Sequence, residues 1–233
     1  SITGKYKKSI KYYEIALNKG GINPTIYYNI GVAYFYLNQI NKAEYFYKKS
    51  YKINSNDEKL KKNYSLLLLA KQKYKKAWKF FDGRLHLDEF VSKNSSISNI
   101  RNKLWKDSSI NSSDKILVIK EQGIGDEILY GSMYPDLLKV YPKCKIETET
   151  RLLPVFKRSF GDNNNFVPFS FYSKQKKEIK KFDKILYAGS LGRIFRNKIL
   201  DFPKKNFLIA DNNKIKEIKK IIQKLGPSKK IGI

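Results

Sequence analysis

The sequence has few of the residues that build disulfides, metal sites and histidine-dependent catalysis. Its 233 residues include one cysteine, Cys144, and one histidine, His86. A lone cysteine excludes an internal disulfide and any site with several thiolate ligands. A Ser-His-Asp triad or a two-histidine metal site would depend on His86, which lies in a helix-like stretch with no partner pattern. A packed or exposed histidine is therefore the simpler interpretation.

Acidic residues are also scarce. Lys and Arg number 48 against 21 Asp and Glu, which gives a formal net charge of +27. This excess raises nucleic acid or anionic lipid as a partner. The lysines are spread along the whole chain, however, and accompany many Asn, Ile, Tyr and Phe, a set that A/T-rich codons encode. We interpret the charge as solvated surface that also suits anionic substrates, and we do not expect nucleic acid as the partner.

Long apolar runs are missing as well. The longest, Leu66–Ala70 and Ile116–Ile119, fall far short of the roughly 18 residues that a membrane span needs. No signal-peptide core follows Ser1. We therefore expect a soluble, cytoplasmic protein with no membrane span.

The chain does contain an internal repeat of 34 residues. Small residues recur at Ser9, Ala43 and Ala77, and an aromatic residue follows each by four positions. A small residue suits a close helix crossing, and the aromatic side chains fill the space beside it. In the middle unit, Asn23-Pro24 offers an N-cap and a first-turn proline, and the second helix is expected over Ile40–Ile53.

The repeat resembles the tetratricopeptide repeat family over about residues 1–87. The middle unit fits that family's pattern at Tyr27, Ile30, Gly31, Tyr34, Ala43, Tyr47 and Ser50. The third unit departs from it, with Lys61, Ser65 and Arg84 at the aromatic, glycine and last small positions. Such solenoids bind partners along the concave face formed by the first helix of each unit.

The resemblance therefore implies a partner-binding face on the first helix of the middle unit. Its residues would be Thr25, Tyr28, Val32, Phe35 and Tyr36. Packing of these aromatic side chains against neighbouring helices is the alternative.

The periodicity changes after a Ser- and Asn-rich linker, in which Leu104-Trp105 is an apolar anchor. Lys115–Lys120 is a short β-branched run, typical of a buried parallel strand. A glycine turn at Glu121–Glu127 follows, and then an amphipathic helix bent at Pro135. Strand, glycine turn and helix together open a doubly wound α/β domain.

The remaining pattern predicts more elements of that domain. Further strands are expected at Lys145–Thr150, Phe166–Phe169, Lys184–Ala188 and Phe207–Ala210, and helices at Leu152–Ser159 and Lys214–Leu225. The fold class is α plus α/β, with helical repeats at 1–91, a linker at 92–113, a Rossmann-like domain at 114–230 and the start of a second domain at 231–233. Neither end resembles a natural terminus, so we expect a piece of a longer protein.

Several motifs in this half are shared with one group of proteins. They are Leu104-Trp105, Ile116–Ile119, Glu121–Glu127, Tyr134-Pro135, Glu149–Leu152, Gly189–Arg193, Phe195-Arg196 and Asp201–Pro203. Over about residues 104–233 the chain resembles bacterial proteins in which tetratricopeptide repeats precede a domain similar to lipopolysaccharide heptosyltransferases (glycosyltransferase family 9, GT-B architecture). The resemblance implies the acceptor-binding first half of a GT-B enzyme, whose second domain binds the nucleotide-sugar.

The glycine turn carries the candidate chemistry. Gly123 and Gly125 allow a tight turn at the carboxyl end of the first strand, where amides at a helix start face an anion or a hydroxyl. The turn lacks the third glycine of a dinucleotide fingerprint and the Lys-Ser/Thr of a P-loop. Taken alone, Asp126 is an N-cap. The resemblance makes it the general base for the acceptor hydroxyl, with Glu121 orienting it or substituting for it.

The resemblance also implies a set of substrate contacts. These are Gly123, Gly125, Glu127, Arg151, Ser190 and Arg193. For Arg151 and Arg193, pairing with a phosphate or a sugar acid competes with an ordinary surface salt bridge. No metal is expected, since nothing in the sequence resembles the Asp-x-Asp metal site of the other large glycosyltransferase architecture. No cofactor is expected, since the nucleotide-sugar donor is a substrate, held mainly by the second domain. This chain alone should then be inactive.

Three functions stay open from the sequence. The first is a glycosyltransferase that transfers a sugar to a glycan or protein acceptor, with the repeats recruiting the acceptor or a partner. The second is a non-catalytic adaptor that binds protein partners through the repeats. The third, a nucleic-acid-binding module, is favoured by charge alone and predicts polyanion binding with a steep salt dependence.

Overall fold

The computed structural model describes residues 2–20, 22–87, 104, 111, 113–161 and 164–224. The chain divides into two compact units. The first unit comprises Ser1–Ser108 and Gly189–Phe202, and the second comprises Ser109–Ala188 and Pro203–Ile233. Within the described ranges, no helix combines the length and the apolar character that crossing a membrane requires.

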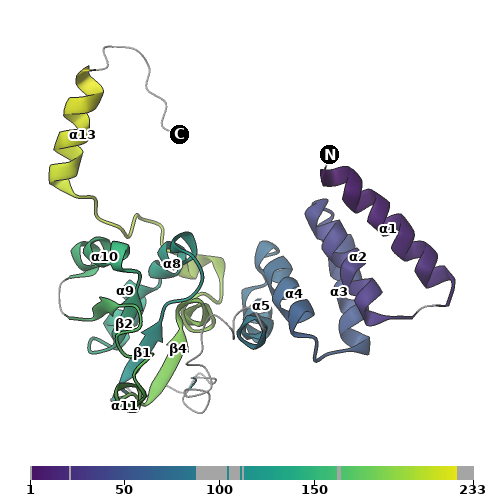
Figure 1. Ribbon diagram of the computed structural model, residues 1–233, viewed down its shortest axis with the longest axis horizontal. Coiled ribbons are helices and arrows are strands. Elements are labelled where there is room, and N and C mark those ends of the chain that lie inside the picture. Colours follow the sequence, from purple (N-terminus) through teal and green to yellow (C-terminus); the bar gives the residue numbers. More distant parts are fainter. Residues whose placement is uncertain are drawn as a thin grey trace. The chain divides into compact units, whose positions relative to one another are not determined.

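The first unit is built from helices that pack in consecutive pairs (Figure 1). They are α1 (Ile2–Asn18), α2 (Pro24–Tyr36), α3 (Ile40–Ile53), α4 (Glu58–Ala70) and α5 (Tyr74–Phe81). Helix α2 packs against α1 and α3, and α4 packs against α5. Helix α3 has the bounds that the 34-residue periodicity predicts.

Local sequence signals set the ends of these helices. The Asn23 side chain accepts a hydrogen bond from the Thr25 backbone N–H at 2.8 Å, and Asp57 does the same for Leu60 at 3.0 Å. These two caps begin α2 and α4, the first helices of successive repeats. The turn inside each repeat contains a left-handed residue, Asn38 or Gln72, and these two positions are also 34 residues apart.

A continuous core joins the second and third repeats. Its buried members are Ala43, Tyr47, Leu60, Tyr64, Leu67, Leu68 and Ala77. Gly31 is required for the α2–α3 crossing, because a Cβ at this position would lie 2.5 Å from the Tyr47 ring. The small and aromatic residues that define the repeat therefore meet at its closest helix contacts.

The third repeat ends differently from the second. Helix α5 stops at Phe81 and continues as a 3-10 turn, η1 (Asp82–His86), in which His86 is exposed. A Cβ at Gly83 would lie 2.9 Å from the Cβ of Lys61, so glycine allows this turn to approach α4 closely.

The segment Gly189–Phe202 belongs to the helical unit, although the sequence placed it inside the Rossmann-like domain. It contains α12 (Gly192–Phe195) and the 3-10 turn η5 (Ile199–Asp201). The physical reason is its packing against α5, which includes a ring contact between Tyr74 and Phe202.

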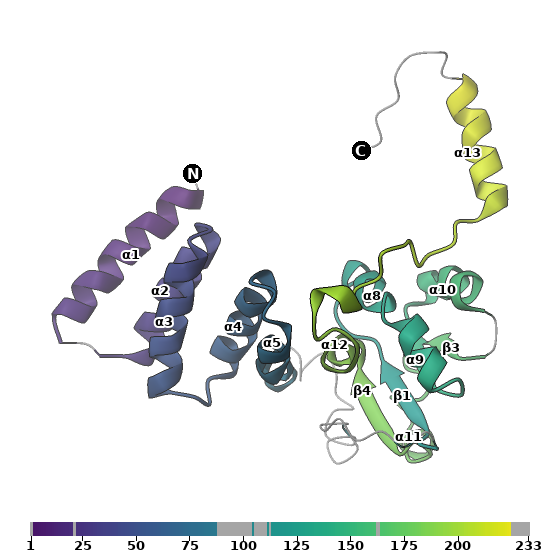
Figure 2. The same cartoon turned by 180° about the vertical axis from the view of Figure 1, so that it is seen from behind.

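The second unit contains a four-stranded parallel sheet in the order β3-β2-β1-β4. The strands are β1 (Ile116–Ile119), β2 (Lys145–Thr148), β3 (Phe166–Pro168) and β4 (Lys184–Tyr187). Figures 1 and 2 both show β1 beside β4, with Ile119 opposite Tyr187. Every residue of β1 is buried, as the continuous apolar run predicts.

The helices of this unit follow the strands. They are α8 (Ile124–Gly131), α9 (Tyr134–Val140), α10 (Leu153–Phe160), α11 (Lys176–Ile179) and α13 (Asn212–Lys224), with the 3-10 turn η3 (Thr150–Leu152). A further 3-10 turn, η4 (Ala188–Leu191), begins at the end of this unit's first segment, and its last three residues belong to the helical unit. The single bent helix expected after the glycine turn is two helices, because Pro135 occupies the first turn of α9 and starts it anew.

One predicted strand is wrong. Residues Phe207–Ala210 form no strand, because their backbone bonds to side chains of α10 instead of to a neighbouring strand. Ile209 donates its N–H to Ser159 Oγ at 2.9 Å, and its carbonyl accepts from Arg158 Nε at 2.8 Å. The strand expected from Lys230 and most of the linker, including Trp105, lie outside the described residues.

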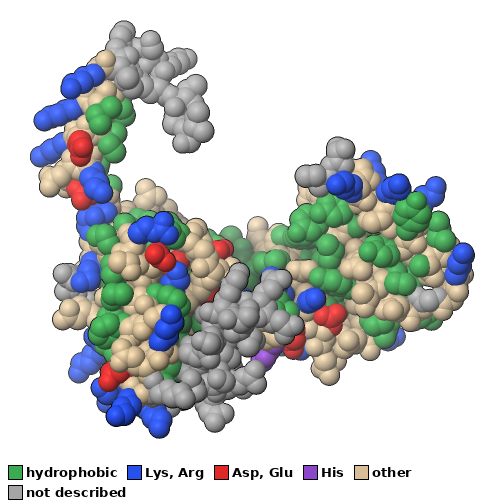
Figure 3. Space-filling view, in the orientation of Figure 1, with side chains coloured by type: hydrophobic (Ala, Val, Ile, Leu, Met, Phe, Trp, Pro, Cys, Tyr) green, Lys and Arg blue, Asp and Glu red, His purple; other side chains and the backbone are tan. Residues whose placement is uncertain are grey.

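Helix α13 confirms the predicted final helix but buries none of its side chains. Its isoleucines, which are 36–55% exposed, are Ile215, Ile218, Ile221 and Ile222. Figure 3 shows hydrophobic side chains along one side of this helix and lysines along the other.

Candidate functional sites

The glycine turn lies at the carboxyl end of β1, between the last strand residue and α8. The chain leaves β1 at Ile119, passes through the buried Glu121, and begins α8 with Gly123 as the N-cap. The left-handed residue of the turn is Gln122 (φ 61°), whereas the sequence assigned the tight turn to Gly123 and Gly125. Extended backbone at Gly123 suffices to enter the helix (φ −91°, ψ 174°).

Asp126 occupies the third position of α8 and is not its N-cap. Its Oδ2 accepts a hydrogen bond from the Gly123 backbone N–H at 3.3 Å, which satisfies one amide at the helix start. The carboxylate is partly exposed, and its other oxygen has no partner among the described residues. A Cβ on Gly125 would meet no atom within 4 Å, so the surface beside Asp126 is open.

Glu127 has a different place from its neighbour Asp126. Its carboxylate is fully buried and accepts hydrogen bonds from the Thr148 hydroxyl and from the Glu149 backbone N–H, the latter at 2.9 Å. Lys120 Nζ lies 3.7 Å from its second oxygen. These contacts tie the first turn of α8 to the end of β2.

Charged side chains continue along the same edge of the sheet, after β2. Lys120 Nζ donates to Glu149 Oε2 at 2.9 Å, and this lysine, with Arg151, lowers the pKa of the Glu149 carboxyl. Arg151 is 75% exposed, with its Nε 3.6 Å from Glu149 Oε1. The structure thus brings Glu121, Asp126 and Arg151 to the carboxyl ends of β1 and β2, as the parallel sheet requires.

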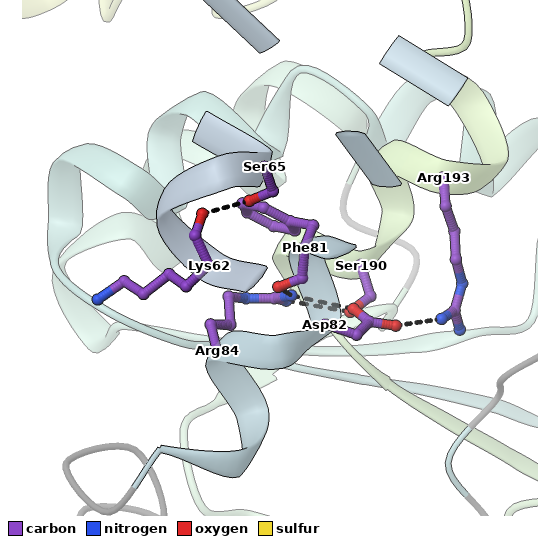
Figure 4. Close-up of polar contacts among 7 residues, drawn as sticks. All are labelled: Lys62, Ser65, Phe81, Asp82, Arg84, Ser190 and Arg193. Carbon is purple, nitrogen blue, oxygen red and sulfur yellow. Dashed lines mark hydrogen bonds and ion pairs between the residues drawn. The ribbon is translucent and has the colours of Figure 1, made fainter. Parts of the chain in front are cut away.

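Ser190 and Arg193 lie in the first unit, in contact with Asp82 (Figure 4). Ser190 Oγ donates to Asp82 Oδ1 at 2.7 Å, and Arg193 pairs with Asp82 Oδ2. The buried Arg84 donates to Asp82 Oδ1 and Ser190 Oγ, both at 3.0 Å, and to the Phe81 carbonyl. These contacts give both residues a structural role, and substrate binding by them stays a prediction.

Sequence analysis did not single out Trp78 or Asp82, which bind the segment Gly189–Phe202 through hydrogen bonds and an ion pair. Trp78 Nε1 donates to the Arg196 carbonyl at 2.6 Å, and a Cβ on Gly192 would lie 2.4 Å from the Trp78 ring. One signal was available, since Arg84 stands where the repeat pattern has a small residue. A buried cation there requires an anionic partner nearby.

The predicted partner-binding face of α2 is partly packed and partly open. Tyr28, Val32 and Phe35 pack at the edge of the repeat core, whereas Thr25 is exposed and Tyr36 is 62% exposed. Asn63 of α4 donates to the Tyr28 hydroxyl at 2.7 Å.

Two further contacts define the chemistry of this face. The Tyr36 ring stacks on Tyr6 of α1 with centroids 5.0 Å apart. Burial raises the pKa of Tyr28, and the charge of Asp57 adds to this rise, so the hydroxyl stays protonated. The face therefore offers aromatic surface and neutral hydroxyl and amide groups.

Comparison with known proteins identifies a family for the part of the helical unit that contains α2 and α3. Residues 24–57 match the tetratricopeptide repeat. These residues are α2, α3 and the turn that leads to α4. The helical unit thus carries a tetratricopeptide repeat, a module that generally mediates protein–protein interaction.

The chain is also similar to one curated protein. It is 27% identical over 131 residues to Protein FlbA of Caulobacter vibrioides (strain ATCC 19089 / CIP 103742 / CB 15). The match covers 51% of this chain and 22% of that protein, so the chain spans about a fifth of the relative's length.

Proposed function

We propose that this chain is part of a glycosyltransferase, in which the tetratricopeptide repeat recruits a protein partner or acceptor and the α/β unit binds the acceptor. One observation supports the catalytic part most directly. The turn that carries Asp126 starts at the carboxyl end of β1. This strand lies between β2 and β4, at the point where the strand order of the sheet reverses. Open α/β sheets bind their ligands at this switch point.

The proposed step is transfer of a sugar from a nucleotide-sugar to a hydroxyl of a glycan or protein. Asp126 Oδ1 takes the proton of that hydroxyl as the hydroxyl oxygen attacks the anomeric carbon. The bond from this carbon to the nucleotide's phosphate oxygen breaks, and the nucleotide leaves with the electron pair. Glu121, which is buried just after β1, adds a second carboxylate to the site, and Arg151 adds an exposed cation at the same edge of the sheet.

The donor would be held mainly by the second domain of the GT-B architecture. Helix α13 supports this part of the proposal, since its row of exposed isoleucines needs an apolar surface to cover it. A further α/β domain of the same protein supplies such a surface.

A full-length protein that extends past Ile233 tests the proposal. Released nucleotide is measured for a panel of nucleotide-sugars with the protein's co-purifying partners as acceptors. Asp126→Asn should lower transfer by about 100-fold or more while the Tm is unchanged. Asp114→Asn, a matched charge change outside this site, should leave transfer intact.

The alternative is a non-catalytic adaptor, which the repeat by itself supports. Nucleotide release that is equal in the wild type and in Asp126→Asn would reject the role of Asp126. Partner binding without release from any donor would favour the adaptor.

A further inference from the structure

The neighbouring face of α4 carries two lysines whose side chains have no partner among the described residues. They are Lys59 and Lys62, which lie 34 residues after Thr25 and Tyr28 and so occupy the equivalent positions of the next repeat. The Asn63–Tyr28 hydrogen bond shows that α2 and α4 meet along this side. We call the surface formed by Thr25, Tyr28, Val32 and Tyr36 of α2 with Lys59, Lys62 and Leu66 of α4 the inner face.

The two acidic residues at the start of α4 already have partners. Asp57 caps α4 through the Leu60 N–H, and Glu58 pairs with Lys61 at 2.9 Å. Helix α2 has no charged residue between Pro24 and Tyr36. In Figure 4 the Lys62 side chain extends away from the Asp82 cluster, and its amine is not joined to the other residues drawn.

The inner face therefore combines positive charge with apolar and aromatic surface. Tyr36 is 62% exposed and Leu66 is 39% exposed, so both offer contact area to a ligand. A basic ligand would be repelled by these two lysines, whereas a purely apolar one would desolvate their charges without compensation. An acidic segment with interspersed apolar residues satisfies both features.

We propose that the inner face binds an acidic protein segment that also carries aromatic or aliphatic side chains. This inference rests on the proposed recruiting role of the repeat and names the chemistry of the partner. Carboxylates of the segment pair with Lys59 and Lys62, and its apolar side chains lie against Tyr36 and Leu66. The Tyr28 hydroxyl, which accepts a hydrogen bond from the Asn63 amide, adds a neutral polar group to the same face.

The test selects random peptides of about twelve residues, displayed on phage, against the whole chain. Enriched sequences are synthesised, and their Kd values are measured by fluorescence anisotropy. We expect net negative peptides that contain Leu, Phe, Tyr or Trp, with affinity that falls as salt rises. The double variant Lys59→Gln/Lys62→Gln should weaken their binding by about tenfold.

A matched control separates the inner face from total charge. Lys52 and Lys76 are exposed lysines on the second helices α3 and α5, and neither side chain forms a hydrogen bond or ion pair with a described residue. Lys52→Gln/Lys76→Gln makes the same charge change and should alter Kd by less than about twofold. Equal weakening by both double variants would overturn the proposal.

Three other results of the binding experiment would also contradict the proposal. Neutral or basic peptides that lose affinity in Tyr36→Ser would overturn the acidic partner and leave the recruiting role standing. No enrichment at all would overturn both. Tighter binding of single-stranded DNA than of any peptide, with the same dependence on Lys59 and Lys62, would assign the lysines to a polyanion instead.

Discussion

Trp78 donates its indole N–H to the backbone carbonyl of Arg196, 118 residues further along the chain, at 2.6 Å. This bond fastens the segment that follows β4 to the last helix of the repeats. The same segment contains Gly192, whose Cα faces the Trp78 ring closely. The helical unit is therefore completed by residues that the chain supplies after most of the α/β unit has been made.

Gly192→Ala should destabilise the helical unit. The added Cβ would lie 2.4 Å from the Trp78 ring, and overpacking of this kind costs about 1–3 kcal/mol. Thermal unfolding followed by circular dichroism measures the effect. Gly125→Ala is the matched control, since nothing lies within 4 Å of its Cβ, and should leave stability unchanged or raise it by up to about 1 kcal/mol. Equal Tm shifts in the two variants would contradict the packing argument.

Asp82→Asn should also destabilise the unit, by about 1.5–3 kcal/mol, because the partly buried Arg193 and the buried Arg84 each lose the ion pair with this carboxylate. Urea unfolding measures the change. Glu217→Gln removes one negative charge from an exposed side chain of α13 that forms no hydrogen bond or ion pair with a described residue, and its urea midpoint should match that of the wild type. An Asp82→Asn protein as stable as the Glu217→Gln protein would show that the charge of Asp82 does not contribute to the stability of the fold.

Glu44 should make stability depend on pH in the acid range. Burial opposes its ionisation, but hydrogen bonds from Lys71, Lys48 and Lys73 outweigh this and lower the pKa of Glu44 to about 2. Because the pKa is lower in the folded state, the ionised Glu44 stabilises the fold at pH values above the ordinary glutamate pKa. This added stability is lost as the pH falls from about 4.5 to about 2.

The measurement compares wild type with Glu44→Gln. The variant should be less stable by about 2 kcal/mol near pH 7, and the difference should shrink steadily below about pH 4.5. Glu217→Gln is again the control, with no such trend. A constant difference at all these pH values would exclude the ion cluster as its cause.

Cys144 should resist alkylation in the folded protein. It is 1% exposed, and burial raises the pKa of its thiol to about 12. Since the thiolate is the reactive form, labelling with iodoacetamide near pH 8 should be about 100-fold slower than in the urea-unfolded chain. Mass spectrometry of timed samples measures both rates, and rapid labelling of the folded form would contradict the burial.

The locally encoded parts of the structure were predictable. The 34-residue spacing of small and aromatic residues gave the paired helices, and Asn23 and Asp57 marked helix starts through caps that act over two or three residues. The apolar run Ile116–Ile119 predicted a buried strand, and the turn after it predicted a helix start, although the N-cap is Gly123 and Asp126 is the third helical residue. Each of these signals depends on a short period or on neighbours in the chain.

Sequence alone determined the repeat and the strand–turn–helix, whereas the tertiary structure decided which segments complete them. It assigned Gly189–Phe202 to the helical unit, through contacts with Trp78 and Asp82 that lie more than a hundred residues away in the chain. It also left residues Phe207–Ala210 without a strand partner, since side chains of α10 took their backbone hydrogen bonds. Such contacts have no periodicity, because they depend on where the folded chain brings distant residues together.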